Sequence, residues 1–151
     1  MASASVTGAV IERYATFTIN STAKLYFHEA PLRDTAAAAV APPYVVLQDD
    51  GTTVDYEFEE APIELTRLRF EVYATSLANA DAIASAIRYN AGTITAGSGM
   101  DHTESLPLTG MDHMAMIRIS EQRWQEGDRS TTGTPIYRIS MRYEVTVKRT
   151  A

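Results

Sequence analysis

The stretch Arg67–Gly92, which has the sequence RLRFEVYATSLANADAIASAIRYNAG, predicts one strand that leads directly into one helix. Over its first part, apolar and polar side chains alternate, which is typical of a strand with one buried face. The buried side is predicted to carry Leu68, Phe70, Val72 and Ala74, and the other side Arg67, Arg69, Glu71 and Tyr73. We therefore expect this segment to be the central strand of a sheet.

The second part of the stretch predicts a helix that covers this sheet. Ser76 precedes the helical pattern, and a serine in that position accepts a hydrogen bond from a backbone N–H that has no partner inside the helix. Apolar residues then recur every three or four positions, and Gly92 is the expected end of the helix. The recurring apolar residues are Leu77, Ala80, Ile83, Ala84 and Ile87.

Toward the N-terminus, the sequence predicts a further helix and a short strand. From Ser5 onward, apolar residues are spaced for a helix of about three turns. A short strand is expected around Leu25–Phe27, followed by a connecting loop over 33–43 that ends at two prolines. The spaced residues of the helix are Val6, Val10, Tyr14 and Phe17.

Residues 44–58 predict a hairpin. Tyr44–Gln48 is a short apolar run, Asp49-Asp50-Gly51 is a turn signal, and the alternation resumes over Val54–Phe58. The polar side of the second strand is acidic and is expected to face solvent. It consists of Asp55, Glu57 and Glu59, with Glu60 beside them.

After the central helix, the sequence predicts a flexible loop, a strand, a hairpin tip and a last strand. The loop covers 93–113, because this segment is rich in glycine, serine and threonine and is long for a compact domain. The strand covers Met114–Ser120, with Ile117 and Ile119 on one face, and the tip covers 123–134. Alternation over Tyr137–Lys148 predicts a long final strand.

These elements predict an α+β fold in a single domain over 1–151. The sheet should be mostly antiparallel, because its long strands are joined by hairpin turns. The N-terminal helix and the central alanine-rich helix should pack on one face of the sheet, since each has one apolar side to bury.

The composition excludes several classes of function. The chain contains no cysteine, which excludes disulfides, cysteine-bound zinc and thiol catalysis. Its net charge is −6 and its 13 basic residues are scattered, so it lacks the basic patch that general DNA binding requires. We expect neither a signal peptide nor a membrane span, because no apolar run is long enough.

Two Asp-His pairs are the candidate metal ligands of this sequence. Asp101-His102 and Asp112-His113 both occur in a Gly-Met-Asp-His sequence, and imidazole with carboxylate binds several metal ions. These residue types are also ordinary in loops, which is the interpretation that we favour. We therefore expect no metal and no other cofactor.

The candidate catalytic carboxylates are Glu57, Glu59, Glu60 and Glu64. A catalytic carboxylate needs burial or a charged neighbour to shift its pKa, whereas these residues are expected to face solvent. The sequence contains no Gly-x-Ser-x-Gly elbow, phosphate-binding glycine loop or dinucleotide-binding pattern. The sequence therefore favours a protein that is not an enzyme.

Four segments of the chain, taken together and in their order along it, resemble the small tail-completion or tail-terminator proteins of tailed bacteriophages. Relatives of these proteins also occur in prophages and gene-transfer agents. The resemblance covers roughly 43–148 and departs from the family pattern in two places, the long connection after the central helix and the long segment before Tyr44. The resembling segments are Tyr44–Gln48 with the Asp-Gly turn, Leu68–Ala74, the alanine-rich helix through Ala80, Ala84 and Arg88, and Ile136–Val145.

The resemblance implies a structural role in the neck or tail of a virion that is assembled in the host cytoplasm. Such proteins form a ring, usually of six subunits, that caps the tail tube and presents a surface to the head side. The implied partners are further copies of the chain, the tail tube protein and a head-completion or connector protein, without a membrane. DNA passes through the ring, and the net charge of −6 suits a channel to which DNA does not adhere.

Two alternatives remain at this stage. One is a head-closure or connector protein at another level of the same neck, and the other is a small metal-binding module or enzyme with a site near His102 and His113. Metal that is lost in a His113→Ala variant would favour the latter.

We expect residues 93–113 and 123–134 to contact neighbouring proteins. Trp124 lies near the predicted tip, where an exposed aromatic favours an interface, although packing against the base of the strands is the commoner alternative. Deletion of 97–109 is expected to leave the fold intact and to weaken assembly. The predicted contact residues are Met100, Met111, Trp124, Glu126, Asp128 and Arg129, together with Arg67, Arg69 and Glu71, which equally suit a solvated face.

Overall fold

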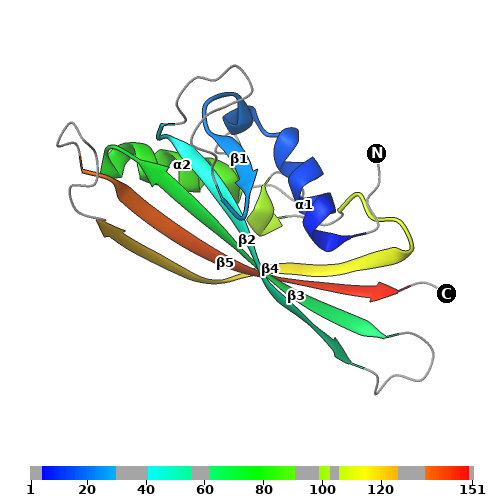
Figure 1. Cartoon of the computed structure of the whole chain (residues 1–151). Coiled ribbons are helices and arrows are strands. Elements are labelled where there is room, and N and C mark those ends of the chain that lie inside the picture. Colours follow the sequence, from blue (N-terminus) through cyan, green and yellow to red (C-terminus); the bar gives the residue numbers. More distant parts are fainter. Residues whose placement is uncertain are drawn as a thin grey trace.

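A computed structural model describes residues 5–29, 41–55, 62–90, 99–102, 106–125 and 135–149 (Figure 1). The helical elements are α1 (Val6–Ala15), the 3-10 helix η1 (Thr18–Ser21), α2 (Leu77–Tyr89) and the 3-10 helix η2 (Met100–His102). The strands are β1 (Lys24–Phe27), β2 (Tyr44–Asp55), β3 (Ile63–Ala74), β4 (Met111–Gln125) and β5 (Tyr137–Arg149).

The strands form one sheet in the order β1-β2-β3-β5-β4, with β3 at its centre. Only the β1–β2 pair is parallel among the pairs described, and the other three are antiparallel. Both α-helices lie on the same side of the sheet, as Figure 1 shows. The predicted α+β class, the mostly antiparallel sheet and the placement of both helices on one face are therefore confirmed.

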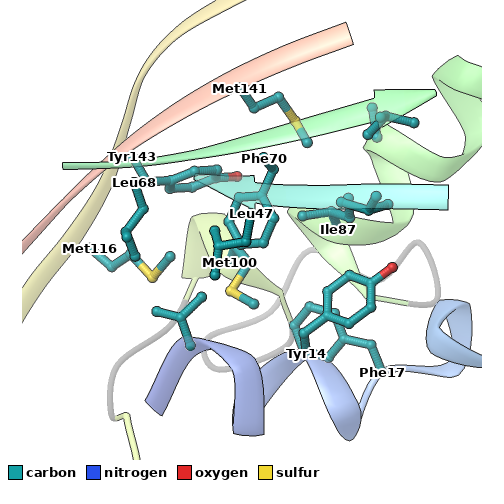
Figure 2. Packing of buried hydrophobic residues seen from close by; sticks show 14 of the residues in the cluster. Tyr14, Phe17, Leu47, Leu68, Phe70, Ile87, Met100, Met116, Met141 and Tyr143 are labelled. Atoms are coloured by element: carbon teal, nitrogen blue, oxygen red, sulfur yellow. The ribbon is translucent and has the colours of Figure 1, made fainter. Parts of the chain in front are cut away.

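The core lies between the helices and this covered face of the sheet. Its strand side chains include Leu68, Phe70 and Val72 from β3, which were predicted from their alternation and are fully buried. Figure 2 shows how Tyr14 and Phe17 approach them from the N-terminal segment, while Ile87 approaches from α2. The Tyr14 hydroxyl donates a hydrogen bond to the backbone oxygen of Ala23 at 2.6 Å, so its polar end is satisfied inside the core.

Serine caps begin both α-helices, and the cap at Ser76 was predicted from the sequence. The Ser5 hydroxyl accepts a hydrogen bond from the Gly8 N–H at 3.0 Å, and the Ser76 hydroxyl accepts one from the Asn79 N–H at 3.2 Å. The helix α2 ends earlier than expected, at Tyr89, with Asn90 at a φ of 41°. Asparagine tolerates positive φ better than most residues, so Asn90 ends the helix. The expected end, Gly92, lies outside the described residues.

The predicted hairpin over 44–58 is wrong, because β2 continues through the expected turn. The strand pairs with β3 from Tyr44 to Asp55, and its register shifts between Asp49 and Gly51, where it forms a bulge. Gly51 has a φ of 110°, and its N–H donates to the Asp49 side chain at 2.8 Å. An Asp-Gly pair meets the local needs of a bulge as well as those of a turn. Of the acidic row, Glu57, Glu59 and Glu60 lie outside the described residues.

The segment after α2 contributes to the core, in contrast to the expected free loop over 93–113. Met100 is fully buried and Leu106 is 4% exposed, and β4 already begins at Met111. Figure 2 shows Met100 between the sheet and the N-terminal helix. Gly99 lies against the last turn of α2, where a Cβ atom would come within 2.1 Å of the Arg88 backbone oxygen. This close approach fixes the return of the chain to the helix.

The strand β4 is longer than predicted at both ends, since it runs from Met111 to Gln125. Trp124 therefore lies within the strand, directly opposite Arg138 of β5, and not at a tip. Two bulges interrupt the register, between His113 and Ala115 and between Arg118 and Ser120. The second bulge makes Ile119 an extra residue that interrupts the regular alternation of β4.

Candidate functional site

The side of the sheet that faces away from both helices, called the open face below, carries a row of aromatic side chains. One residue comes from each strand, and the row includes Tyr44, Tyr73, Arg138 and Trp124 in direct register. Tyr44 and Tyr73 have ring centroids 5.1 Å apart, and the Arg138 guanidinium lies 4.0 Å from the Trp124 ring centroid. Tyr26 extends the row to β1, at 6.2 Å from Tyr44.

A charged row lies next to the aromatic row. Glu71 is only 6% exposed, although it belongs to the polar side of β3. Its carboxylate lies 3.4 Å from Arg69 and 3.6 Å from Arg138, and it accepts a hydrogen bond from the Tyr73 hydroxyl at 3.2 Å. Arg67 pairs with Glu144 at 3.2 Å. The charges of Arg67, Arg69 and Glu71, expected at an interface or in solvent, are therefore paired within the chain.

A second charged cluster lies on the covered face, between α2, η2 and β4. Glu121 of β4 pairs with Arg88 of α2 at 2.5 Å and with Arg118 at 3.4 Å. Arg118 also pairs with Asp101 of η2 at 3.1 Å, and Arg123 pairs with Asp81 of α2. These contacts attach the edge strand to both helical elements. Sequence reasoning missed this cluster, because its members come from three elements that are separated in the sequence.

Asp101 also accepts a hydrogen bond from the Tyr143 hydroxyl. Burial raises the pKa of Tyr143 well above its usual value, and the hydrogen bond to Asp101 and the negative charge of Asp101 raise it further. The phenol therefore remains protonated as a hydrogen-bond donor. With both Tyr143 and Arg118 as partners, the Asp101 carboxylate is engaged in structural contacts.

The second Asp-His pair is divided between the two faces of the sheet. Asp112 and His113 are neighbours on β4, so their side chains point to opposite faces of the sheet. Among the residues that the structure describes, no three His, Cys, Asp or Glu side chains are grouped closely enough to hold a metal ion. The side chain of His102 lies outside the described part.

A pocket of about 170 Å³ opens at the start of α1. It is smaller than the roughly 300 Å³ at which small-molecule sites begin. Its carboxylates already have partners, since Asp49 accepts from the Thr7 hydroxyl at 3.1 Å and Glu64 accepts from Arg149 at 2.7 Å. Glu64, a candidate catalytic carboxylate in the sequence, is thus a partner of the last strand.

Exposed apolar side chains gather on β4, which is one of the two edges of the sheet. Met114, Ile117 and Ile119 are 53%, 59% and 46% exposed. Met114 and Ile119 are the extra residues of the two bulges. The strand itself was predicted, but its position at an edge depends on strand order, for which the sequence carries no signal.

The predicted contact residues are distributed over several environments. Met100 and Met111 are buried in the core, at 0% and 6% exposure, so these side chains offer almost no surface to a neighbour. Trp124 is half-buried under Arg138 on the open face. Glu126, Asp128 and Arg129 lie outside the described residues.

Comparison with solved structures finds this arrangement of helices and strands in a virion. One chain of the structure titled "Virion of native gene transfer agent (GTA) particle" superposes with a TM-score of 0.63 at 14% sequence identity. The match covers 95% of this chain and 94% of that chain. The two chains share a fold.

No family model and no curated protein matches this sequence. The likeness is therefore one of fold, spread over nearly the whole of both chains.

No helix among the described residues is long and apolar enough to cross a membrane.

Proposed function

We propose that this chain is a structural protein of a tailed bacteriophage or gene-transfer-agent virion. In this role it forms a ring, of six subunits, that caps the tail tube and joins it to the head-side connector. The observation that carries the proposal is the fold that this chain shares, over 95% of its length, with a chain of a gene transfer agent virion. The resemblance of its central strand, central helix and last strand to tail-terminator proteins points to the same role.

The physical features of the molecule support an assembly role. Ion pairs attach one element to another, as at Arg88–Glu121 and Arg138–Glu71. Three of the exposed apolar residues among those described lie on the edge strand β4, where a second protein can cover them. A net charge of −6 disfavours adhesion of DNA to a channel through the ring.

The partners in this proposal are further copies of the chain, the tail tube protein and a connector protein. The ring resides in the neck or tail of the virion after assembly in the host cytoplasm. A connector at another level of the neck would have the same class of partners. The experiment therefore has to determine the position of this protein along the neck.

The test is to delete the gene in the strain that produces the particles and to image the products by electron microscopy. We expect heads without joined tails, together with tail tubes of irregular length, and we expect a plasmid copy of the gene to restore complete particles. Normal joined particles from the deletion strain would contradict the proposal.

The level in the neck is tested with a small epitope tag and gold-labelled antibody. A label at the junction of tube and connector supports the terminator role. A label next to the head, together with tubes of normal length in the deletion strain, would identify a connector instead. Stoichiometric metal in the purified protein, lost in His113→Ala, would point away from both roles.

A further inference from the structure

The edge strand β4 lacks the lysine and proline residues that commonly protect an exposed edge. It is 15 residues long and is the last strand in the sheet order, so no described strand pairs with its outer side. Unpaired backbone groups on such an edge can pair with another chain, and natural edges usually carry lysine or proline to prevent this. The sequence of β4, MDHMAMIRISEQRWQ, contains neither residue.

The bulges of β4 add apolar surface. A bulge normally helps to protect an edge by twisting it away from a partner. Here the extra residues are Met114 and Ile119, which project apolar side chains that are about half exposed. Together with Ile117, they form an apolar patch along the edge, and its burial would be favourable at about 25 cal/mol per Å².

The opposite edge of the sheet also has an exposed apolar residue. On β1, Phe27 is 44% exposed. Of the six large hydrophobic residues that are exposed among those described, four thus lie on the two edge strands, and the remaining two, Ile11 and Leu77, lie on helices. Both edges of one sheet therefore have apolar surface to cover.

The two edges run in directions that suit pairing with each other. β1 is parallel to β2, and each following pair in the order β2-β3-β5-β4 is antiparallel. As a result, β1 and β4 run in opposite directions. If a second copy continues the sheet, its β1 meets β4 as an antiparallel neighbour, which is the commoner pairing in proteins.

We propose that the outer edge of β4 binds the outer edge of β1 of a second copy of this chain. The contact joins two different surfaces, so repetition closes into a ring when the rotation between copies allows it. A two-fold β4–β4 pair would leave Phe27 and the β1 edge open in both copies, whereas in a ring both edges of every copy take part in a contact. The inference rests on the proposed function for its ring, and it names the surfaces that build the ring.

The absence of cysteine makes this contact testable by site-specific cross-linking. Lys24 of β1 and Ser120 of β4 are exposed, and their register places both on the open face. Lys24→Cys and Ser120→Cys proteins are mixed and treated with a short thiol-specific cross-linker, both free in solution and in assembled particles. We expect a dimer that contains one copy of each variant, and neither variant alone should cross-link.

Two outcomes would overturn the proposal. A cross-linked dimer from Ser120→Cys alone would show a two-fold β4–β4 pair. Absence of the mixed dimer both in solution and in particles would show that these edges do not meet. A mixture of Ser120→Cys with Leu77→Cys, on the exposed side of α2, is the control for random collision and should give no dimer.

A matched pair of lysine variants provides a second measurement. Ile119 of β4 and Leu77 of α2 are both 46% exposed. Ile119→Lys should weaken self-association at least about tenfold, because it places a charge in the buried contact, and Leu77→Lys should leave it unchanged. Equal effects of the two substitutions would overturn the proposal. Thermal unfolding of both variants verifies that each is folded, and Ile117→Lys replaces Ile119→Lys if that variant unfolds.

The two proposals fail in different ways. Capped tubes formed by a protein whose β1 and β4 edges never cross-link would overturn the edge contact and leave the proposed function standing. Cross-linked rings that never cap a tube would support the edge contact and contradict the terminator role.

Discussion

The two faces of β3 are stabilised by different kinds of contact. On the covered face, Leu68, Phe70 and Val72 are fully buried beneath the helices. On the open face, Arg69, Glu71 and Tyr73 have partners beside them in the sheet, such as Asp50, Arg138 and Tyr44. Burial of apolar side chains beneath the helices thus stabilises the covered face. Lateral contacts between neighbouring strands stabilise the open face.

The covered face itself changes character toward β4. Opposite the buried Tyr143 and Met141 of β5, the strand β4 places Arg118 and Glu121. These charges are accommodated because α2 and η2 supply Arg88 and Asp101 as partners. A sheet face under helices is thus apolar at its centre and can be ionic at its edge, provided that each charge is paired.

The largest expected effect concerns the segment that connects α2 to β4. Deletion of residues 97–109 removes Met100 and Leu106 from the covered face, at roughly 2 to 5 kcal/mol each. Because a domain is stable by only about 5 to 15 kcal/mol, we expect this deletion to unfold the protein, contrary to the expectation from sequence. Circular dichroism measures the outcome, and Met100→Ala isolates the contribution of one buried side chain. A folded deletion protein with unchanged Tm would contradict the role of this segment in the core.

The next largest effect compares two aromatic residues of β3. Phe70→Ala on the covered face should lower the free energy of unfolding by about 3 to 5 kcal/mol, because Phe70 is fully buried. Tyr73→Ala on the open face should lower it by about 1 kcal/mol, since the ring is only partly buried and loses lateral contacts. Urea unfolding measures both values. Equal losses would mean that the open face is packed as tightly as the core.

Alkaline pH should affect the covered face through its buried tyrosines. Burial raises the pKa of Tyr14 and Tyr143 above the ordinary value of 10.0 that applies in the unfolded chain. The unfolded state then releases protons that the folded state retains, so stability is complete below about pH 10 and falls as the pH rises above it. Each tyrosine contributes a loss of up to about 1.4 kcal/mol per pH unit.

The measurement is urea unfolding between pH 9 and pH 11 for the natural protein and Tyr143→Phe. The variant should lose less stability over this range, because it has one buried phenol fewer. A Tyr73→Phe variant serves as the control, since Tyr73 lies on the open face and is only half-buried. An identical pH dependence in all three proteins would contradict the assigned role of Tyr143.

The smallest effect concerns the aromatic row of the open face. The contact of Arg138 with Trp124, at 4.0 Å between guanidinium and ring centroid, should give a coupling energy of about 0.5 to 1 kcal/mol in a double-mutant cycle. Trp124→Phe, which retains a ring, should preserve part of this coupling, whereas Trp124→Ala should remove it. Strict additivity of Trp124→Ala and Arg138→Ala would show that the lateral contact does not stabilise the open face.

The sequence was sufficient where structure follows from neighbouring residues. The alternation along β3 and β5 identified the buried side of each strand, because successive side chains of a strand point to opposite faces. The cap at Ser76 was also predicted, since a cap depends on residues within one turn of the helix. For the same reason, the α+β class followed from the order of these elements.

Structural features that depend on contacts between residues far apart in the sequence could not be predicted from the sequence. Asp49-Asp50-Gly51 fits a turn and a bulge equally well, and only the continued pairing of β2 with β3 decides between them. Met100 lies in a glycine-rich segment without periodicity, so its burial results from the docking of η2 against α2. The edge position of Ile117 and Ile119 follows from strand order, and the cluster around Glu121 follows from bulges in β4.

The contact of Gly99 with the end of α2 has a consequence for the evolution of this fold. Every substitution of glycine adds a Cβ atom, and here that atom would lie 2.1 Å from the backbone oxygen of Arg88, which no change of rotamer can relieve. Core positions such as Met141 can exchange among apolar residues of similar volume with modest loss. At 14% identity to a chain of the same fold, a glycine that follows the central helix is therefore a sounder anchor for aligning distant relatives than any apolar position of the core.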